Sequence, residues 1–283
     1  MSENSEVENE KISNFAGDFK HEHKMKRVLI TACVGATILA SCNNNVAEAP
    51  REGYAKVNFP DSSMYDGEWK HGLRDGEGKM IWSDGNQYDG VWKDDKPNGQ
   101  GTYTWANGNK FEGEFRDSLP CGEGKYTWAN GAYYVGGYSN GHPNGEGKYL
   151  APDGSMKEGT FKDGWLEGSG VAINEFSEKY TGEFHKGLPH GQGTKEYPNG
   201  DKYVGSWQKG KSEGKGTYYY ASGSVYEGEF HRGKAEGFGT YTWHDGNVYE
   251  GNWAHDMRNG YGKLITTDGE VYEGDWLNDE FIG

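Results

Sequence analysis

The sequence predicts an all-β protein: an elongated single-layer antiparallel sheet built from about ten tandem β-hairpins. Three observations support this: a strict 23-residue repeat, an Asn-Gly or Asp-Gly turn signal in most repeats, and 47 glycines against only 8 prolines. Apolar residues make up 33% of the 283 residues, yet 14% of all residues are aromatic. This composition is typical neither of a conventional globule nor of a disordered acidic chain.

The chain begins with a polar stretch, residues 1–24, which we expect to be a disordered extension. Residues 25–42 then combine a short basic start, Met25-Lys26-Arg27, with an apolar run and small residues before Cys42, as a secretory signal does. Because an export signal normally starts at its basic region, we hypothesise that Met25 is the true start. Residues 43–53 are predicted to form a polar tether.

The apolar run Val28–Ala40 has 13 residues, or about 20 Å of helix, which is short for a bilayer core. The ending Leu39-Ala40-Ser41-Cys42 resembles a bacterial lipobox. That resemblance implies cleavage before Cys42 and lipidation of its thiol. The expected location is therefore the bacterial cell envelope, as a membrane-anchored lipoprotein. The alternative is an inner-membrane protein with an uncleaved anchor helix.

Residues 54–283 form the predicted repeat domain. The pattern Tyr-x-Gly-x-Trp recurs every 23 residues from Tyr65, and nine full repeats run to Val271 without insertion or deletion. Counting Tyr65 as position 1, nine of ten residues at position 1 and all ten at position 5 are aromatic, while positions 3 and 12 are always glycine. Such regularity indicates one repeat domain rather than a compact globule.

The Asn-Gly and Asp-Gly pairs at positions 20 and 21 of most repeats indicate a hairpin turn at these positions. A two-residue turn would send the aromatic positions to opposite faces. A three-residue loop instead places Tyr103 opposite Phe111 and gathers the aromatic positions on one face, so we favour it. The other face then pairs Lys79 with Asp89 and Lys263 with Glu273, which indicates a solvated face.

The two ends of the repeat array fit the same scheme. Residues 55–59 resemble half a repeat and should pair with residues 65–69, while residues 272–276 should pair with residues 262–266. About twenty strands are expected.

The net charge of −15 argues against nucleic acid and against direct adhesion to anionic lipid headgroups, because both require clustered cations. The three cysteines, Cys33, Cys42 and Cys121, cannot make a disulfide framework. The histidines show no paired ligand spacing apart from His21-x-His23, so we expect no metal site.

No catalytic site or cofactor is expected either. The carboxylates fall on the solvated face, and the Gly-x-Gly pairs precede no helix that could bind phosphate. Cys121 has no recurring histidine beside it and reads as a plain free thiol. Enzymes usually carry loops of differing length on their scaffold, and this domain has none. The chain is therefore predicted not to be an enzyme.

The aromatic face is the candidate binding site. A single sheet has no second layer to cover its rings, and large exposed apolar surfaces usually bind partners. The predicted groove consists of Trp92, Trp105, Trp128, Tyr134, Tyr138, Tyr149, Phe161, Trp165, Tyr180 and Phe184.

The repeat degenerates between residues 151 and 178, where Lys157 replaces the tyrosine of position 1 and Ser177 replaces the turn glycine. One interpretation is neutral drift. The other is a pocket or bend lined by Trp165, Phe161, Tyr149 and Tyr180.

The pattern of Tyr-x-Gly-x-Trp, then glycine at position 8 and Gly-x-Gly at positions 12–14, resembles the MORN-repeat family (membrane occupation and recognition nexus). The resemblance covers Tyr65 to Gly283. It implies an elongated twisted sheet of hairpins that acts as a non-catalytic scaffold and binds protein partners along its aromatic face. Glycan or cell-wall binding is the alternative, since exposed rings also stack on sugars. A cytosolic or inner-membrane scaffold is expected if the signal is not cleaved.

Overall fold

The computed structural model describes residues 49–283, and every regular element in this part of the chain is a β-strand. The described chain divides into two compact units, unit 1 with residues 49–145 and unit 2 with residues 146–283. The predicted extension 1–24, the signal segment 25–42 with Cys42, and tether residues 43–48 lie outside the described residues.

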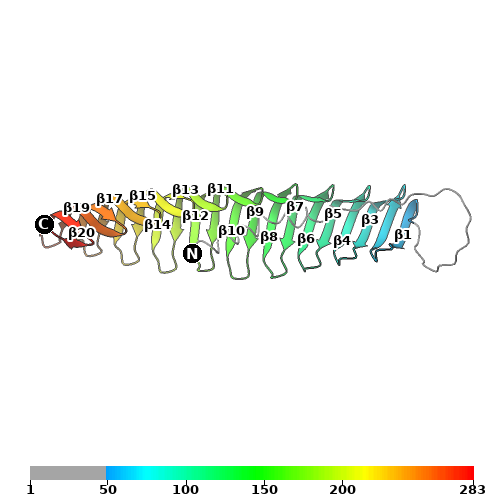
Figure 1. The fold of residues 1–283 in the computed structure, drawn as a ribbon, viewed down its shortest axis with the longest axis horizontal. Coiled ribbons are helices and arrows are strands. Elements are labelled where there is room, and N and C mark those ends of the chain that lie inside the picture. Colours follow the sequence, from blue (N-terminus) through cyan, green and yellow to red (C-terminus); the bar gives the residue numbers. More distant parts are fainter. Residues whose placement is uncertain (1–48) are drawn as a thin grey trace, which may run out of the picture. The chain divides into compact units, whose positions relative to one another are not determined.

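Unit 1 is a row of antiparallel strands in which each strand pairs with its neighbours in sequence (Figure 1). Its strands are β1 (Glu52–Asn58), β2 (Met64–Lys70), β3 (Leu73–Ile81), β4 (Gln87–Lys93), β5 (Lys96–Thr104), β6 (Lys110–Arg116), β7 (Leu119–Thr127) and β8 (Tyr133–Ser139). The division between the units falls within β9 (His142–Leu150).

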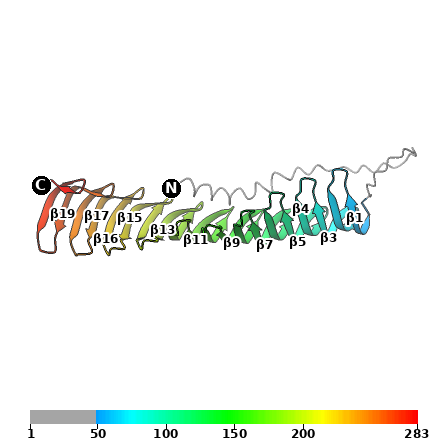
Figure 2. The ribbon, with the colours of Figure 1, turned by 90° about the horizontal axis from the view of Figure 1, so that it is seen from below.

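Unit 2 repeats the same plan, again as a single layer (Figure 2). Its strands are β10 (Met156–Lys162), β11 (Trp165–Ile173), β12 (Lys179–His185), β13 (Leu188–Glu196), β14 (Lys202–Gln208), β15 (Lys211–Tyr219), β16 (Val225–His231), β17 (Lys234–Thr242), β18 (Val248–Ala254), β19 (Met257–Ile265), β20 (Val271–Leu277) and β21 (Glu280–Phe281). The prediction of an all-β sheet of tandem hairpins is confirmed.

The predicted register is also confirmed. Tyr103 lies opposite Phe111 and Gly101 opposite Gly113, as the three-residue loop requires. That loop is closed by two backbone bonds, from Trp105 N–H to Asn109 O (2.9 Å) and from Gly108 N–H to Trp105 O (2.9 Å). The aromatic positions therefore share one face.

A second, tighter turn lies at positions 7 and 8, where two residues connect the strands. In the turn between β4 and β5, Asp94 and Asp95 both have positive φ, 47° and 66°, the combination that a type I′ hairpin turn needs. A bulge follows, since Gly67 faces Gly78 but Trp69 faces Arg74. This bulge bends each hairpin at the glycine of position 12.

The ends of the array pair as expected, with small differences in their bounds. Val57 lies opposite Tyr65, but β1 already begins at Glu52, so Glu52 and Gly53 belong to the sheet rather than the tether. At the other end, Leu264 lies opposite Tyr272. The short β21 adds one strand to the expected twenty.

The core consists mainly of the rings at positions 1 and 5, joined in some repeats by rings at positions 16 and 18. Tyr65 is fully buried and makes T-shaped contacts with Trp69 and Trp92, at 5.1 and 5.4 Å between ring centroids. Its hydroxyl donates to Glu68 O (3.0 Å). The Tyr65 ring packs directly on the backbone of Gly78. Only glycine fits at this position, because a Cβ there would overlap the Tyr65 hydroxyl. The rings thus pack on glycine backbone and on one another, so they are buried without a second layer of secondary structure.

Candidate functional site

Most of the predicted groove is core rather than surface. Eight of its ten side chains are at most 5% exposed and therefore belong to the core. They are Trp92, Trp105, Tyr134, Tyr138, Tyr149, Phe161, Tyr180 and Phe184. Trp128 and Trp165 are only half-buried. The eight side chains are buried because the rings pack on one another and on glycine backbone.

The irregular repeat does not form the hypothesised pocket in the predicted way. Trp165 lies opposite Lys162 while the next residue, Leu166, lies opposite Phe161. Since successive residues of a strand point to opposite faces, Trp165 and Phe161 do not line one pocket. Leu166 is 1% exposed and lies over Gly159, where other repeats place the ring of position 1. Leucine at position 10 thus fills the place left by Lys157.

The surface rings of unit 2 come instead from positions 16 and 18. We call this set the unit 2 ring row: Tyr197, Tyr218, Tyr220, Tyr241 and Trp243. All five are half-buried or exposed, and Tyr220 is 37% exposed. Ring contacts connect successive repeats, with 6.0 Å between Tyr197 and Tyr218 and 5.5 Å between Tyr220 and Tyr241.

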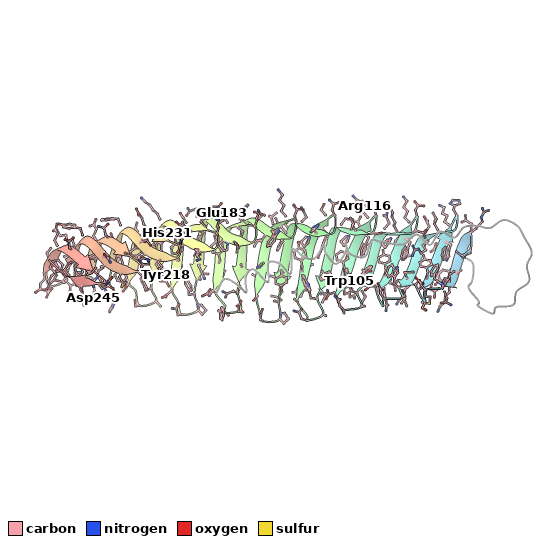
Figure 3. All side chains as sticks on the ribbon, viewed as in Figure 1. Trp105, Arg116, Glu183, Tyr218, His231 and Asp245 are labelled. Carbon is pink, nitrogen blue, oxygen red and sulfur yellow. The ribbon has the colours of Figure 1, made fainter. Side chains whose placement is uncertain are left out.

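The unit 2 ring row lies between the two edges of its sheet. Figure 3 shows His231 at the edge of the two-residue turns, Asp245 at the edge of the three-residue loops, and Tyr218 between them. This row was missed because sequence periodicity shows which rings share a face but not which of them are covered. Ring size at position 18 would not have found it, since Trp243 belongs to the row while Trp82 and Trp128 of unit 1 are also half-buried.

Carboxylates lie beside these rings. The Tyr218 hydroxyl donates to Asp201 Oδ2 (2.8 Å), and Ala221 N–H donates to Asp201 Oδ1 (2.8 Å). Burial, aided by nearby negative charge, raises the pKa of Tyr197 and of Tyr220 to about 12. Both hydroxyls therefore stay protonated at neutral pH. The row offers ring faces and neutral hydroxyl groups next to negative charge.

The opposite face is charged, as predicted. Lys79 pairs with Asp89 (3.8 Å), Lys148 with Glu158 (2.8 Å) and Lys263 with Glu273 (2.9 Å). All six side chains are at least 41% exposed, so these pairs contribute little stability and keep this face hydrated.

Other chemistry is sparse. Among residues 49–283, no group of three or more His, Cys, Asp or Glu side chains is arranged to hold a metal ion. Burial and the neighbouring Glu114 raise the pKa of the Cys121 thiol, which makes it a poor nucleophile at neutral pH. The described part of the chain also holds no helix with the length and hydropathy needed to cross a bilayer.

Tandem hairpins with a periodic aromatic core define a repeat-based protein-interaction module. A model of the MORN repeat matches nine segments: residues 65–87, 88–110, 111–133, 134–156, 158–173, 180–202, 203–225, 226–248 and 249–271. These segments cover well over half of the sequence, and the chain belongs to the MORN-repeat family. No curated protein matches it.

Two of the solved structures to which the chain is similar are TCP domains. The SAS-4 TCP domain of Drosophila melanogaster, in complex with a proline-rich motif of Ana2, is 17% identical over 55% of this chain and 85% of that one, with a TM-score of 0.35. The wild-type TCP10 domain of Danio rerio CPAP is 12% identical over 79% of this chain and 100% of that one, with a TM-score of 0.37.

Proposed function

We propose that this protein is a non-catalytic scaffold that binds protein partners along the unit 2 ring row. One observation carries the proposal: five contiguous rings stay partly exposed on a sheet whose other face is covered by ion pairs. Contiguous exposed aromatic surface is characteristic of interaction sites. Tyrosine suits this role because its ring packs and its hydroxyl forms hydrogen bonds.

We further propose that the scaffold is held at the membrane of a bacterial envelope by lipid on Cys42. The support is the Leu-Ala-Ser-Cys ending after a short basic and apolar stretch. Lipidation would leave the chain from Asn43 onward outside the membrane, with the repeats free to meet envelope proteins. The alternative remains an uncleaved anchor at residues 28–40.

The binding proposal is tested with two adjacent tyrosines. Tyr219, the last residue of β15, and Tyr220, which follows it, are similarly exposed, at 40% and 37%. As successive residues of an extended chain, they point to opposite faces. Partner proteins that co-purify with the native chain should be lost with Tyr220→Ala and retained with Tyr219→Ala. Equal retention by both variants would refute the ring row as the binding surface. Retention on peptidoglycan that soluble sugar abolishes would favour the glycan alternative.

The anchoring proposal is tested by the intact mass of the membrane-extracted protein and identification of its N-terminal peptide. A chain that begins at acylated Cys42 supports it. An unmodified chain that retains residues 25–41 contradicts it and supports the uncleaved anchor.

A further inference from the structure

Three repeats carry aspartate at position 8, and in two of them this aspartate holds an arginine. Arg74 Nε donates to Asp95 Oδ1 (3.0 Å), and its Nη2 donates to the main-chain O of Asp95 (3.0 Å). The guanidinium carbon lies 4.5 Å from the centroid of Trp92 and 5.9 Å from that of Tyr65. The arginine is thus held by a carboxylate and a tryptophan face together.

The ninth repeat reproduces this arrangement. Arg258 Nε donates to Asp279 Oδ1 (3.0 Å) and its Nη2 to Asp279 O (2.8 Å). Its guanidinium carbon lies 4.4 Å from the centroid of Trp276 and within 6 Å of Tyr249 and Trp243. Two separate repeats therefore use one geometry to bind one chemical group.

The site formed by the eighth repeat together with the start of the ninth has the same geometry but lacks the arginine. Asp256 has φ 71°, like Asp279, and its Oδ1 accepts the Ala235 N–H (2.7 Å) as the other two aspartates accept the N–H of their arginines. Trp253 lies 5.1 Å from Tyr226 at 80°, against 5.3 Å and 80° for the matching pair in the ninth repeat. At the position of Arg74 and Arg258 stands Ala235.

The charge at this place is not compensated within the unit. Asp256 is exposed and takes part in none of the ion pairs formed by residues 49–283. Trp253, at 8% exposure, is somewhat more open than its arginine-covered counterparts Trp92 at 1% and Trp276 at 5%. Tyr220 and Tyr241 of the unit 2 ring row lie alongside, with 6.0 Å between Tyr241 and Trp253.

We propose that Asp256, Trp253 and Tyr220 form a binding site for an arginine side chain of a partner protein. The guanidinium repeats the contacts of Arg258: bonds to Oδ1 and main-chain O of Asp256, and stacking on Trp253. Arginine fits better than lysine because the planar group stacks and donates two bonds at once. The inference deepens the proposed function, since it names the chemistry of the partner at one end of the ring row.

The site is tested with acetyl-arginine-amide as the probe and the indole N–H resonances of the full chain as the readout. The Trp253 indole N–H resonance should shift on addition of the probe. Its titration should give a dissociation constant on the order of 10 mM, as expected for one ion pair with stacking. The neutral isostere acetyl-citrulline-amide should bind at least about tenfold more weakly in the same titration of the Trp253 resonance. Asp256→Asn should weaken the arginine response by a similar factor.

Two further variants use the repeats as their own controls. Arg258→Ala should open a second site, so that Trp276 begins to respond to the probe. Ala235→Arg should fill the site from within, abolish the response of Trp253, and raise the thermal midpoint above that of Ala235→Met.

The site is refuted if citrulline and arginine act alike, if Asp256→Asn responds like the native chain, or if Ala235→Arg melts no higher than Ala235→Met. These outcomes leave the proposed function separately testable. A chain that ignores the probe but still loses its partner with Tyr220→Ala would disprove only the arginine site. A chain that binds the probe but keeps its partner with Tyr220→Ala would disprove only the wider binding surface.

Discussion

Units 1 and 2 place aromatic side chains at the same repeat positions, yet only unit 2 leaves the whole row accessible. In unit 1, Tyr103, Trp105 and Tyr126 are 9%, 5% and 0% exposed. In unit 2, the equivalent Tyr218 and Tyr220 are half-buried and 37% exposed. The spacing of ring centroids does not by itself set this difference, since the Trp82–Tyr103 pair of unit 1 and the Tyr220–Tyr241 pair of unit 2 are both 5.5 Å apart. The same positions thus serve as core around Trp105 in unit 1 and as surface in unit 2, although Trp82 and Trp128 of unit 1 are also half-buried.

Removing a deeply buried ring should destabilise the two units by similar amounts. Trp92→Ala and Trp253→Ala each remove a ring that is at least nine-tenths buried, and each should lower the free energy of unfolding by about 3–5 kcal/mol. Urea unfolding followed by far-UV circular dichroism measures both. A cost below about 1 kcal/mol in either unit would show that these rings are not its core.

Removing a ring at position 18 should destabilise unit 1 more than unit 2. Trp105→Ala should cost about 3 kcal/mol in unit 1, while Tyr220→Ala should cost only about 1 kcal/mol in unit 2, because far less area leaves water there. The same urea series measures the difference. Equal costs would contradict the assignment of unit 1 to core and unit 2 to surface.

A smaller difference lies in the residue at position 22, which joins successive three-residue loops in both units. In unit 1, Asn109 Nδ2 donates to the Tyr126 hydroxyl (2.7 Å) and Asn109 Oδ1 accepts the Ala129 N–H (3.0 Å). In unit 2, the charged Asp201 accepts the matching bonds from Tyr218 and Ala221. One bridge is neutral and the other titrates.

Burial alone would raise the pKa of Asp201, but hydrogen bonds from Ala221, Asn199 and Tyr218 outweigh it and hold the pKa below its usual value. A lowered native pKa adds stability above the unfolded pKa, and this stability is lost as pH falls through the native value. Native unit 2 should therefore lose up to about 1 kcal/mol more than Asp201→Asn between neutral pH and pH 3. Identical pH profiles for the two proteins would contradict this account.

The fold could be predicted because the sequence features that determine it act over a few residues and recur from repeat to repeat. The glycines at positions 3 and 14 fix where rings lie on backbone, and the Asn-Gly and Asp-Gly pairs fix the loops. The loop length then sets the register, as Tyr103 and Phe111 show. The two-residue turn was not predicted, although most repeats carry glycine at position 8. Asp94-Asp95 forms this turn without glycine, because aspartate tolerates positive φ.

The site could be predicted only in part. The sequence placed all the rings on one face but did not show which ones cover the others. It also did not show that Leu166 takes the place of a missing tyrosine, because that requires knowing that positions 1 and 10 share space over Gly159. The vacant partner of Asp256 is visible only against the filled sites at Asp95 and Asp279.

By itself, the sequence determined the all-β class, the 23-residue hairpin unit, the register and the charged outer face. These depend on short-range chemistry: a turn, an alternation and a glycine floor beneath each ring. Only the tertiary structure decided which rings are core and which are surface. That outcome depends on how neighbouring rings of successive repeats cover one another, which the repeat period does not specify: Trp105 is 5% exposed, whereas Tyr220 at the same repeat position is 37% exposed.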